Sequence, residues 1–250
     1  SEPSERVTRI KRILGDIRRA DQDFHMIQSG DSVAVGVSGG KDSLLLLRAL
    51  ALYRDFSPRP FALSAITISP GLEPFDLSGV RQMCDSLAVP YHIVRTEIGK
   101  IIFEERKEPN PCALCSKMRR GALANACNEL GVNKLALGHH RDDAIETLLM
   151  SLLFEGRFHT FQPVTHLERS NITQIRPLIY SSEKQILALT RRLALPVVES
   201  PCPANRHTRR EEMKRLMDEL CKKYPNARSQ ILSALKNEAQ YGLWTHDDEM

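Results

Sequence analysis

The sequence predicts an α/β fold with a doubly wound, mostly parallel five-stranded sheet, and two observations support this prediction. Short apolar or β-branched runs alternate with segments of helical periodicity, a pattern typical of parallel strands joined by helices. The 250 residues include 42% hydrophobic and 26% charged residues. This ordinary globular balance argues against disordered, collagen-like and coiled-coil classes. We therefore expect one α/β domain, preceded by an N-terminal helix and followed by a helical C-terminal region.

The expected elements begin with an amphipathic helix over residues 4–27, in which Ile10, Ile13 and Ile17 stand at helical spacing. Strands and helices then alternate. The strands are expected at residues 32–37, 61–68, 91–95, 134–137 and 172–176, and the helices at 42–53, 77–87, 143–154 and 183–193. Two closing helices are expected at 205–224 and 227–241. The expected domains are the N-terminal helix (1–28), the α/β domain (29–195), and a cysteine loop with C-terminal helices (196–250).

Composition and charge narrow the class of protein. Six cysteines are too few for a disulfide scaffold. The N-terminus has no apolar signal core, and no apolar run reaches the length of a bilayer span. We therefore expect a soluble cytoplasmic protein that makes no membrane contact. The net charge of +4 permits an anionic partner without requiring one. Basic residues cluster at 6–19, 117–120 and 206–223, where a solvated helix face is the simplest interpretation of each cluster alone.

The strongest functional signal is Val37-Ser38-Gly39-Gly40-Lys41-Asp42-Ser43, between the first expected strand and the next helix. A strand–helix turn directs backbone N–H groups and the positive end of the helix toward an anion, and glycines allow its close approach. A dinucleotide fingerprint is absent, and a Walker A loop needs four residues between its glycines. Here three residues separate Gly36 from Gly40. We therefore expect a phosphate-binding loop of another type.

Three cysteines lie in segments bounded by prolines. Cys112 and Cys115 form a C-x-x-C pair after Pro111, and Cys202 lies between two prolines. We expect the prolines to hold both segments as open loops. The spacing fits an iron–sulfur cluster, zinc with a fourth ligand such as His207, or metal-free thiols that carry a persulfide and resolve it as a disulfide. The other three cysteines lie among apolar neighbours on expected helices, which favours buried structural thiols: Cys84, Cys127 and Cys221.

The segment Gly138–Asp143 follows the fourth expected strand and so belongs to the same sheet edge as the glycine loop. Paired carboxylates beside a polyphosphate hold Mg²⁺ or position the reacting groups. Asp142 and Asp143 also stand at the start of an expected helix, where a carboxylate serves as a cap. We expect one to cap and the other to act on the ligand. A metal shared by the adjacent His139 and His140 is not expected, because such residues point to opposite faces.

The combination of motifs resembles the tRNA 2-thiocytidine synthetase (TtcA) family of the ATP-pyrophosphatase (PP-loop) superfamily, over about residues 10–240. The residues that carry the resemblance are Ser38–Ser43, Cys112 with Cys115, Arg119-Arg120-Gly121, Gly138–Asp143, Arg176-Pro177-Leu178 and Cys202. The resemblance implies a PP-loop fold of the adenine-nucleotide α-hydrolase type. It further implies an ATP- and Mg²⁺-dependent thiolase with a three-cysteine [4Fe–4S] cluster. Such an enzyme replaces the C2 oxygen of cytidine-32 in the tRNA anticodon loop by sulfur, through an adenylated intermediate.

The resemblance also implies a role for each matched residue. Val37–Ser43 would bind the ATP phosphates, Gly138 and His139 would border the nucleotide, and Asp142 or Asp143 would serve Mg²⁺ and the activation step. The cluster ligands would be Cys112, Cys115 and Cys202, with Cys112 and Cys202 in catalytic roles. The best candidates for tRNA contact are arginines in two of the basic clusters: Arg119, Arg120, Arg206, Arg209 and Arg210.

One departure from the family pattern is that Cys202 has no second late cysteine beside it. The chain also lacks the terminal zinc-binding cysteine pairs of related uridine thiolases, which favours the cytidine branch.

Expected partners are tRNA and a sulfur donor, either a cysteine desulfurase or sulfide, and the N-terminal helix is compatible with a homodimer. Three alternatives stay open: a PP-loop thiolase of another base or small molecule, an ATP-dependent amide or lysidine-type ligase, and an RNA-binding module with a vestigial nucleotide loop.

Overall fold

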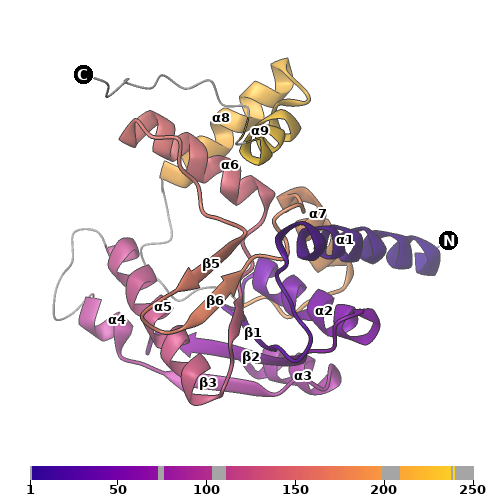
Figure 1. Ribbon diagram of the computed structural model, residues 1–250, viewed down its shortest axis with the longest axis vertical. Coiled ribbons are helices and arrows are strands. Elements are labelled where there is room, and N and C mark those ends of the chain that lie inside the picture. The colour runs from indigo at the N-terminus through magenta and orange to yellow at the C-terminus, as the bar shows by residue number, and fades with distance from the viewer. Residues whose placement is uncertain (1, 73–75, 103–110, 199–208, 238, 240–250) are drawn as a thin grey trace. The chain divides into compact units, whose positions relative to one another are not determined.

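The computed structural model describes residues 2–72, 76–102, 111–198, 209–237 and 239 (Figure 1). The chain divides into two compact units, one formed by residues 1–141 and 161–206 and the other by residues 142–160 and 207–250. The first unit contains the sheet, and the described part of the second is helical. No helix within these ranges combines the length and apolar character needed to cross a membrane.

The first unit is built on a sheet of six strands in the order β3-β2-β1-β4-β6-β5. The strands are β1 (Ser32–Gly36), β2 (Ala62–Ser69), β3 (Tyr91–Arg95), β4 (Lys134–Ala136), β5 (Val164–Leu167) and β6 (Ile172–Ile175). Neighbouring strands are parallel except for β5 and β6, which are antiparallel. The predicted α/β class and mostly parallel sheet are confirmed. The expected count of five strands was too low, because the short edge strand β5 has a mixed polar sequence with no clear alternation.

The direction of the strand order reverses beside β1. In register, Val33 of β1 lies opposite Leu63 of β2 on one side and Lys134 of β4 on the other. The chain winds outward from β1 to β2 and β3, and then crosses back to β4 and β6. Ligands of such sheets bind at this switch point, outside the carboxyl ends of the strands. The loops that follow β1 and β4 therefore define the candidate site.

Helices of the first unit cover the sheet. They are α1 (Glu2–Phe24), α2 (Lys41–Phe56), α3 (Ser78–Ser86), α4 (Ile98–Lys100), α5 (Pro111–Glu129) and α7 (Glu183–Arg192). Ala34 packs with Cys127 of α5 in one core cluster, and the alternate residues Val33 and Val35 are fully buried as well. Strands buried on both faces are typical of parallel sheets. The apolar side of α1 is also buried, as the spacing of Ile13 and Ile17 predicts.

The expected open loop around the C-x-x-C pair was wrong. Residues 111–129 form the helix α5, and Pro111 is its first residue. A proline is well suited to the first helical position, because its missing N–H would have no partner there and its fixed φ matches the helix. Cys112 and Cys115 therefore lie at the beginning of a long helix.

The second unit contains α6 (Arg141–Met150), whose first residue belongs to the sheet unit, the π-helix η2 (Ser151–Glu155), α8 (Arg209–Lys223) and α9 (Ala227–Lys236). Met213 and Met217 of α8 are buried. The predicted closing helices are confirmed within the described residues, and α9 ends earlier than expected, at Lys236. The helix expected over 143–154 begins two residues earlier, at Arg141, and changes to π geometry at Ser151.

Candidate functional site

The glycine loop leaves β1 in a fixed conformation. The N–H of Val37 donates to the carbonyl oxygen of Ile66 at 2.8 Å, and the Thr67 hydroxyl donates to the carbonyl oxygen of Val37 at 2.7 Å. Both partners belong to β2, so the loop begins as an extension of the sheet. Gly39 then adopts a φ of +85°, which only glycine enters without strain. The backbone turns sharply at this residue to start α2.

The start of α2 is arranged for an anion. Gly40 is the N-cap residue, and it provides no side-chain cap. The N–H of Leu44 makes the first helical hydrogen bond, to Gly40 at 3.1 Å, so the preceding N–H groups have no partner within the helix. Ser43 donates to the Gly40 carbonyl at 3.0 Å and accepts from the Ser38 N–H at 3.2 Å. These bonds close the loop, and the N-terminus of a helix such as α2 favours an anion.

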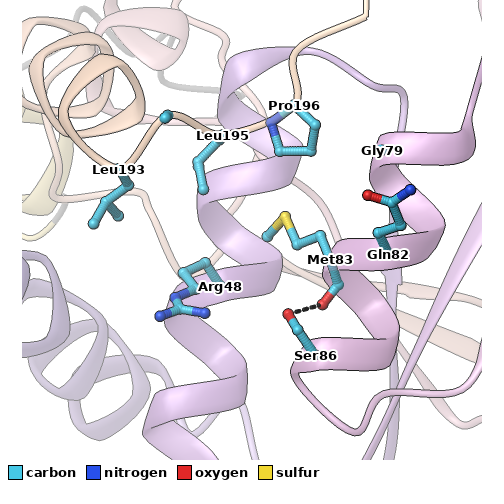
Figure 2. Close-up of a pocket in the computed structure, with 9 residues that line it drawn as sticks. Arg48, Gly79, Gln82, Met83, Ser86, Leu193, Leu195 and Pro196 are labelled. Carbon is cyan, nitrogen blue, oxygen red and sulfur yellow. Dashed lines mark hydrogen bonds between the residues drawn. The ribbon is translucent and has the colours of Figure 1, made fainter.

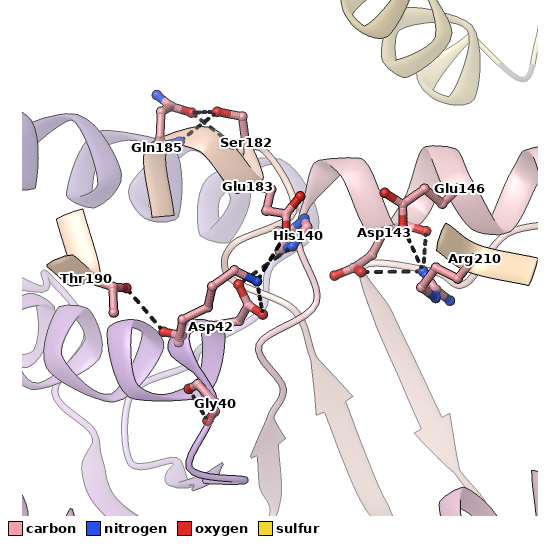
Figure 3. Close-up of polar contacts among 12 residues, drawn as sticks. Gly40, Asp42, His140, Asp143, Glu146, Ser182, Glu183, Gln185, Thr190 and Arg210 are labelled. Carbon is pink, nitrogen blue, oxygen red and sulfur yellow. Dashed lines mark hydrogen bonds and ion pairs between the residues drawn. The ribbon is translucent and has the colours of Figure 1, made fainter. Parts of the chain in front are cut away.

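Lys41 provides a positive charge beside the loop. Its ammonium lies 3.0 Å from Asp42 Oδ2 and 3.2 Å from Glu183 Oε1, at the start of α7 (Figure 3). Burial opposes the charge, but these two carboxylates outweigh it and raise the pKa of Lys41 above its ordinary value. The side chain is therefore a cation throughout the physiological range.

The loop after β4 packs directly on the start of α2. A Cβ at Gly138 would lie 3.0 Å from the carbonyl carbon of Asp42 and 3.0 Å from the nitrogen of Ser43. His140 is buried with its Nε2 3.7 Å from Asp42 Oδ1, a buried oxygen that accepts no hydrogen bond from the described residues. His139 instead stacks near Phe161, with ring centres 5.0 Å apart. The two histidines diverge, as predicted, and Gly138 joins the two halves of the candidate site.

The paired carboxylates lie in the first turn of α6, in the second unit. The Asp142 side chain is 9% exposed and lies 2.8 Å from Nε of Arg228. Arg210 lies 3.4 Å from both Asp143 and Glu146 (Figure 3). Since α6 begins at Arg141, both aspartates follow the cap position, so the expected capping role is wrong, while the role of either aspartate toward the ligand stays a prediction. Negative charge in a first helical turn is favourable all the same.

Arg228 is the centre of a small charged network within the second unit. Besides Asp142, it donates to Asp218 at 2.8 Å and to the sulfur of Cys221 at 3.0 Å. Burial opposes its charge, but Asp218 and Asp142 raise the pKa of Arg228 above its ordinary value. Arg228 therefore stays charged and fixes the orientation of Asp142. Neither Arg228 nor Glu183 was expected from the sequence.

The cysteines fall into two groups. Cys112 and Cys115 lie three residues apart in the first turns of α5. Cys115 is half-buried against the core, and Cys202 lies outside the described residues. Soft thiolates at a helix start suit an iron–sulfur cluster or zinc. Burial raises the pKa of the fully buried thiols Cys84 and Cys127 to about 11, as structural thiols require. The expected burial of Cys221 was wrong, because its thiol is only partly buried and accepts a hydrogen bond from Arg228.

The candidate tRNA-contact arginines are differently placed. Arg120 is exposed and Arg119 half-buried on α5. Arg209 is exposed on α8, whereas Arg210 is engaged with the carboxylates of α6. The fifth candidate, Arg206, lies outside the described residues.

Arg176, of the Arg-Pro-Leu motif, is buried directly after β6. It donates to the carbonyl oxygen of Gln162 at 2.7 Å and to the Thr165 hydroxyl at 3.2 Å. Burial, with a smaller contribution from Arg120, lowers the pKa of Arg176 to about 10. These contacts link Arg176 to β5 and the residues before it, which is a structural role for this arginine.

The segment after α7 crosses the glycine loop. The N–H of Val198 donates to the carbonyl oxygen of Gly39 at 2.9 Å. Pro196 lies against Gly79 of α3, where an added Cβ would come within 2.8 Å of it. Beside this contact, Figure 2 shows a pocket of about 370 Å³ between α2 and α3, with Arg48 and Gln82 among its polar lining residues. The pocket contains none of the predicted site residues.

Comparisons with known proteins agree with this geometry. A family model described as the PP-loop domain matches residues 7–220. The chain is 40% identical over 230 residues to the tRNA-cytidine(32) 2-sulfurtransferase of Pelobacter propionicus, covering 91% of this chain and 86% of the relative. It is 37% identical to the protein of the same name from Geobacter sulfurreducens, covering 92% and 90%.

Two solved structures are similar over nearly the whole chain. One is the U34-tRNA thiolase NcsA from Methanococcus maripaludis with its [4Fe–4S] cluster, at 25% identity and a TM-score of 0.75, covering 97% of this chain and 82% of that chain. The other is the NH3-dependent NAD synthetase of Campylobacter jejuni, at 15% identity and a TM-score of 0.51, covering 98% and 99%. The second likeness concerns the fold alone.

Proposed function

Since this chain belongs to the PP-loop domain family, we propose that it is an ATP-dependent tRNA thiolase that replaces the C2 oxygen of cytidine-32 by sulfur. The observation that carries the proposal is the 40% identity to a tRNA-cytidine(32) 2-sulfurtransferase over nearly the whole of both chains. The glycine loop supports it, because its backbone donors and charge suit a polyphosphate. The pair of cysteines on α5 supports sulfur chemistry, which an amide or lysidine-type ligase does not need.

The glycine loop would bind and orient the ATP phosphates. The backbone N–H groups of Gly39 and of the first helical residues Lys41, Asp42 and Ser43 would donate to the phosphate oxygens, and the Lys41 ammonium would balance their charge. Lys41 already lies between two carboxylates, which hold its ammonium at the start of α2. Cleavage between the α and β phosphates would then transfer AMP to the C2 oxygen of the base, and pyrophosphate would leave. The adenylated oxygen is a good leaving group, whereas the free oxygen is a poor one.

Carboxylates of the chain would hold Mg²⁺, and each of the two units contains candidates. Asp42 is one candidate ligand, because its buried Oδ1 accepts no hydrogen bond from the described residues. Asp142 and Asp143 follow the Gly138–His140 loop along the chain and are held by Arg228 and Arg210. Their oxygens are the hard ligands that Mg²⁺ prefers. We propose that Asp142 or Asp143 serves the metal and the activation step.

Cys112, Cys115 and Cys202 would hold a [4Fe–4S] cluster, which when bound supplies a site for the sulfur that enters the base. The first two cysteines belong to the first turns of α5, and bound iron would hold their sulfurs as thiolates. The half-buried position of Cys115 against the apolar core would limit the access of water and oxidants. The chain would thus provide three soft ligands, one of which, Cys115, is packed against the core.

Several finer features belong to the same proposal. Sulfide or a cysteine desulfurase would provide the sulfur, and the cytoplasm, where tRNA is modified, would be the location. A homodimer formed through α1 would have to use its outer side, because Ile13 and Ile17 are buried within the chain itself. Light scattering on the purified protein tests whether a dimer forms.

The proposal is tested by anaerobic thiolation. The protein is reconstituted with iron and sulfide, then incubated with Mg·ATP, sulfide and unmodified tRNA, and the digested nucleosides are examined by mass spectrometry beside a Cys202→Ala variant. We expect 2-thiocytidine only with ATP and with Cys202 intact. A different thionucleoside would change the base assignment. The absence of any thionucleoside, from a protein that carries its cluster, would overturn the proposal.

A further inference from the structure

An exposed apolar cluster lies at the end of the α6–η2 helix, in the second unit. The side chains of Leu153, Phe154 and Phe158 are 57%, 45% and 70% exposed. We call these three residues the aromatic surface. Apolar side chains that are exposed singly are ordinary, whereas a cluster of them marks a binding surface. Two of the three are planar rings within five residues of one another.

The loop that carries Phe158 is held at both ends. Gly156 ends η2 with a φ of +64°, and the N–H of Arg157 donates to the carbonyl oxygen of Ser151 at 3.2 Å. On the far side, the Thr160 hydroxyl donates to the carbonyl oxygen of Ala144 at 2.9 Å. The ring of Phe158 is therefore presented by an anchored loop. Single turns of π-helix such as η2 are frequent at functional sites.

Positive charge accompanies the aromatic surface. The guanidinium of Arg209 lies over the ring of Phe154, 4.6 Å from its centre. Arg157, also exposed, stands next to Phe158 in the chain and pairs with Glu155. Planar rings beside guanidinium groups bind unpaired nucleotides, because each base stacks on a ring while its phosphate is neutralised.

We propose that the aromatic surface binds unpaired nucleotides of the tRNA anticodon loop, an inference that rests on the proposed function. Sequence-specific RNA binding usually targets loops with bases that can be splayed out and stacked. Cytidine-32 borders such a loop. Arg209 favours this anionic partner over an apolar protein surface, for which its exposed guanidinium would have to be desolvated. The aromatic surface thus adds a stacking contact to the arginines expected from the sequence.

The test measures the affinity of the full-length protein for an unmodified tRNA transcript with cytidine at position 32. Phe158→Ala and Phe154→Ala should each weaken binding by about 5- to 100-fold, the range expected for one lost base–aromatic stack. Phe158→Trp should restore it, and Phe158→Leu should not. Tyr224→Ala is the matched control, since Tyr224 is 56% exposed in the same unit and has a lysine over its ring. It should bind tRNA as the wild type does.

Other outcomes separate this inference from the proposed function. If wild-type protein forms 2-thiocytidine and both alanine variants bind tRNA normally, the surface is not an RNA contact and the function stands. If tRNA binding depends on Phe158 while no thionucleoside forms, the function fails and the surface stands. If Phe158→Ala instead converts a dimer to a monomer in light scattering, with unchanged tRNA affinity, the surface joins two copies of the chain and the inference is overturned. Thermal melting of each variant verifies its fold.

Discussion

Replacing Gly138 with Ala tests how the two halves of the candidate site depend on each other. The added Cβ would lie 3.0 Å from two backbone atoms, the carbonyl carbon of Asp42 and the nitrogen of Ser43. Backbone atoms in the first turn of a helix cannot rotate away as a side chain would. The residue does not have a positive φ, so the substitution adds a steric contact without backbone strain.

The magnitude follows from the distance. Carbon atoms pack at roughly 3.5–4.0 Å, so the start of α2 or the Gly138 loop must move by about 0.5–1 Å. Extra methyl groups in packed sites cost about 1–3 kcal/mol. Since a misplacement of about 1 Å can cost on the order of 100-fold in rate, we expect kcat/KM for ATP to fall by about 10- to 100-fold.

The assay combines calorimetric ATP binding, tRNA-dependent pyrophosphate release and thermal melting. The control is Gly15→Ala, because Gly15 lies within α1 and nothing stands within 4 Å of an added Cβ there. That variant should be stabilised by about 0.5–1 kcal/mol and keep full activity. A Gly138→Ala protein with wild-type ATP affinity and wild-type pyrophosphate release would refute the reasoning.

Three further substitutions separate the roles of the site residues. Lys41→Met should weaken ATP binding by about 10- to 100-fold, which corresponds to the loss of one charged hydrogen bond. Because the pKa of Lys41 is raised, the stability from its ion pairs should be fully present below the ordinary lysine pKa of about 10.4 and be lost as pH rises through the raised pKa. Unfolding measured as a function of pH tests this expectation. Cys115→Ser should abolish the visible absorbance of the reconstituted cluster, whereas Cys127→Ser should keep it and lose only stability. Arg228→Met should cost about 1–3 kcal/mol in urea unfolding, since it leaves Asp142 buried without its arginine, and Asp142→Asn should restore part of that loss in the double variant.

The local parts of the fold and site could be predicted from the sequence. The strand–glycine–helix pattern around Gly39 is defined by neighbouring residues, and the structure has β1 and α2 within a few residues of their expected bounds. The start of α5 was misjudged, because Pro111 is compatible with both a loop and a first helical position. The edge strand β5 was missed, because four residues of mixed polarity have no periodicity to detect.

Contacts between distant segments could not be predicted. Glu183 reaches Lys41 only because α7 packs beside α2, and Arg228 reaches Asp142 only because α9 lies beside α6. A signal for Glu183 existed in the capping box that Ser182 forms with Gln185, which marks the start of α7. It indicates where the helix begins but not what its first turn faces. The partners of a charged residue are thus a property of the tertiary structure.

The continuous helix formed by α6 and η2 determines what kind of contact the aromatic surface can make. Asp142 and Phe154 are twelve residues apart on it, which corresponds to about 18 Å at a rise of about 1.5 Å per residue. A base stacked on Phe154 therefore cannot be the base that reacts beside Asp142. We expect Phe154→Ala to raise KM for tRNA while kcat changes little, since a stack made equally in ground and transition states affects binding alone. A fall in kcat at saturating tRNA, with unchanged KM, would instead mean that the ring acts on the reacting nucleotide.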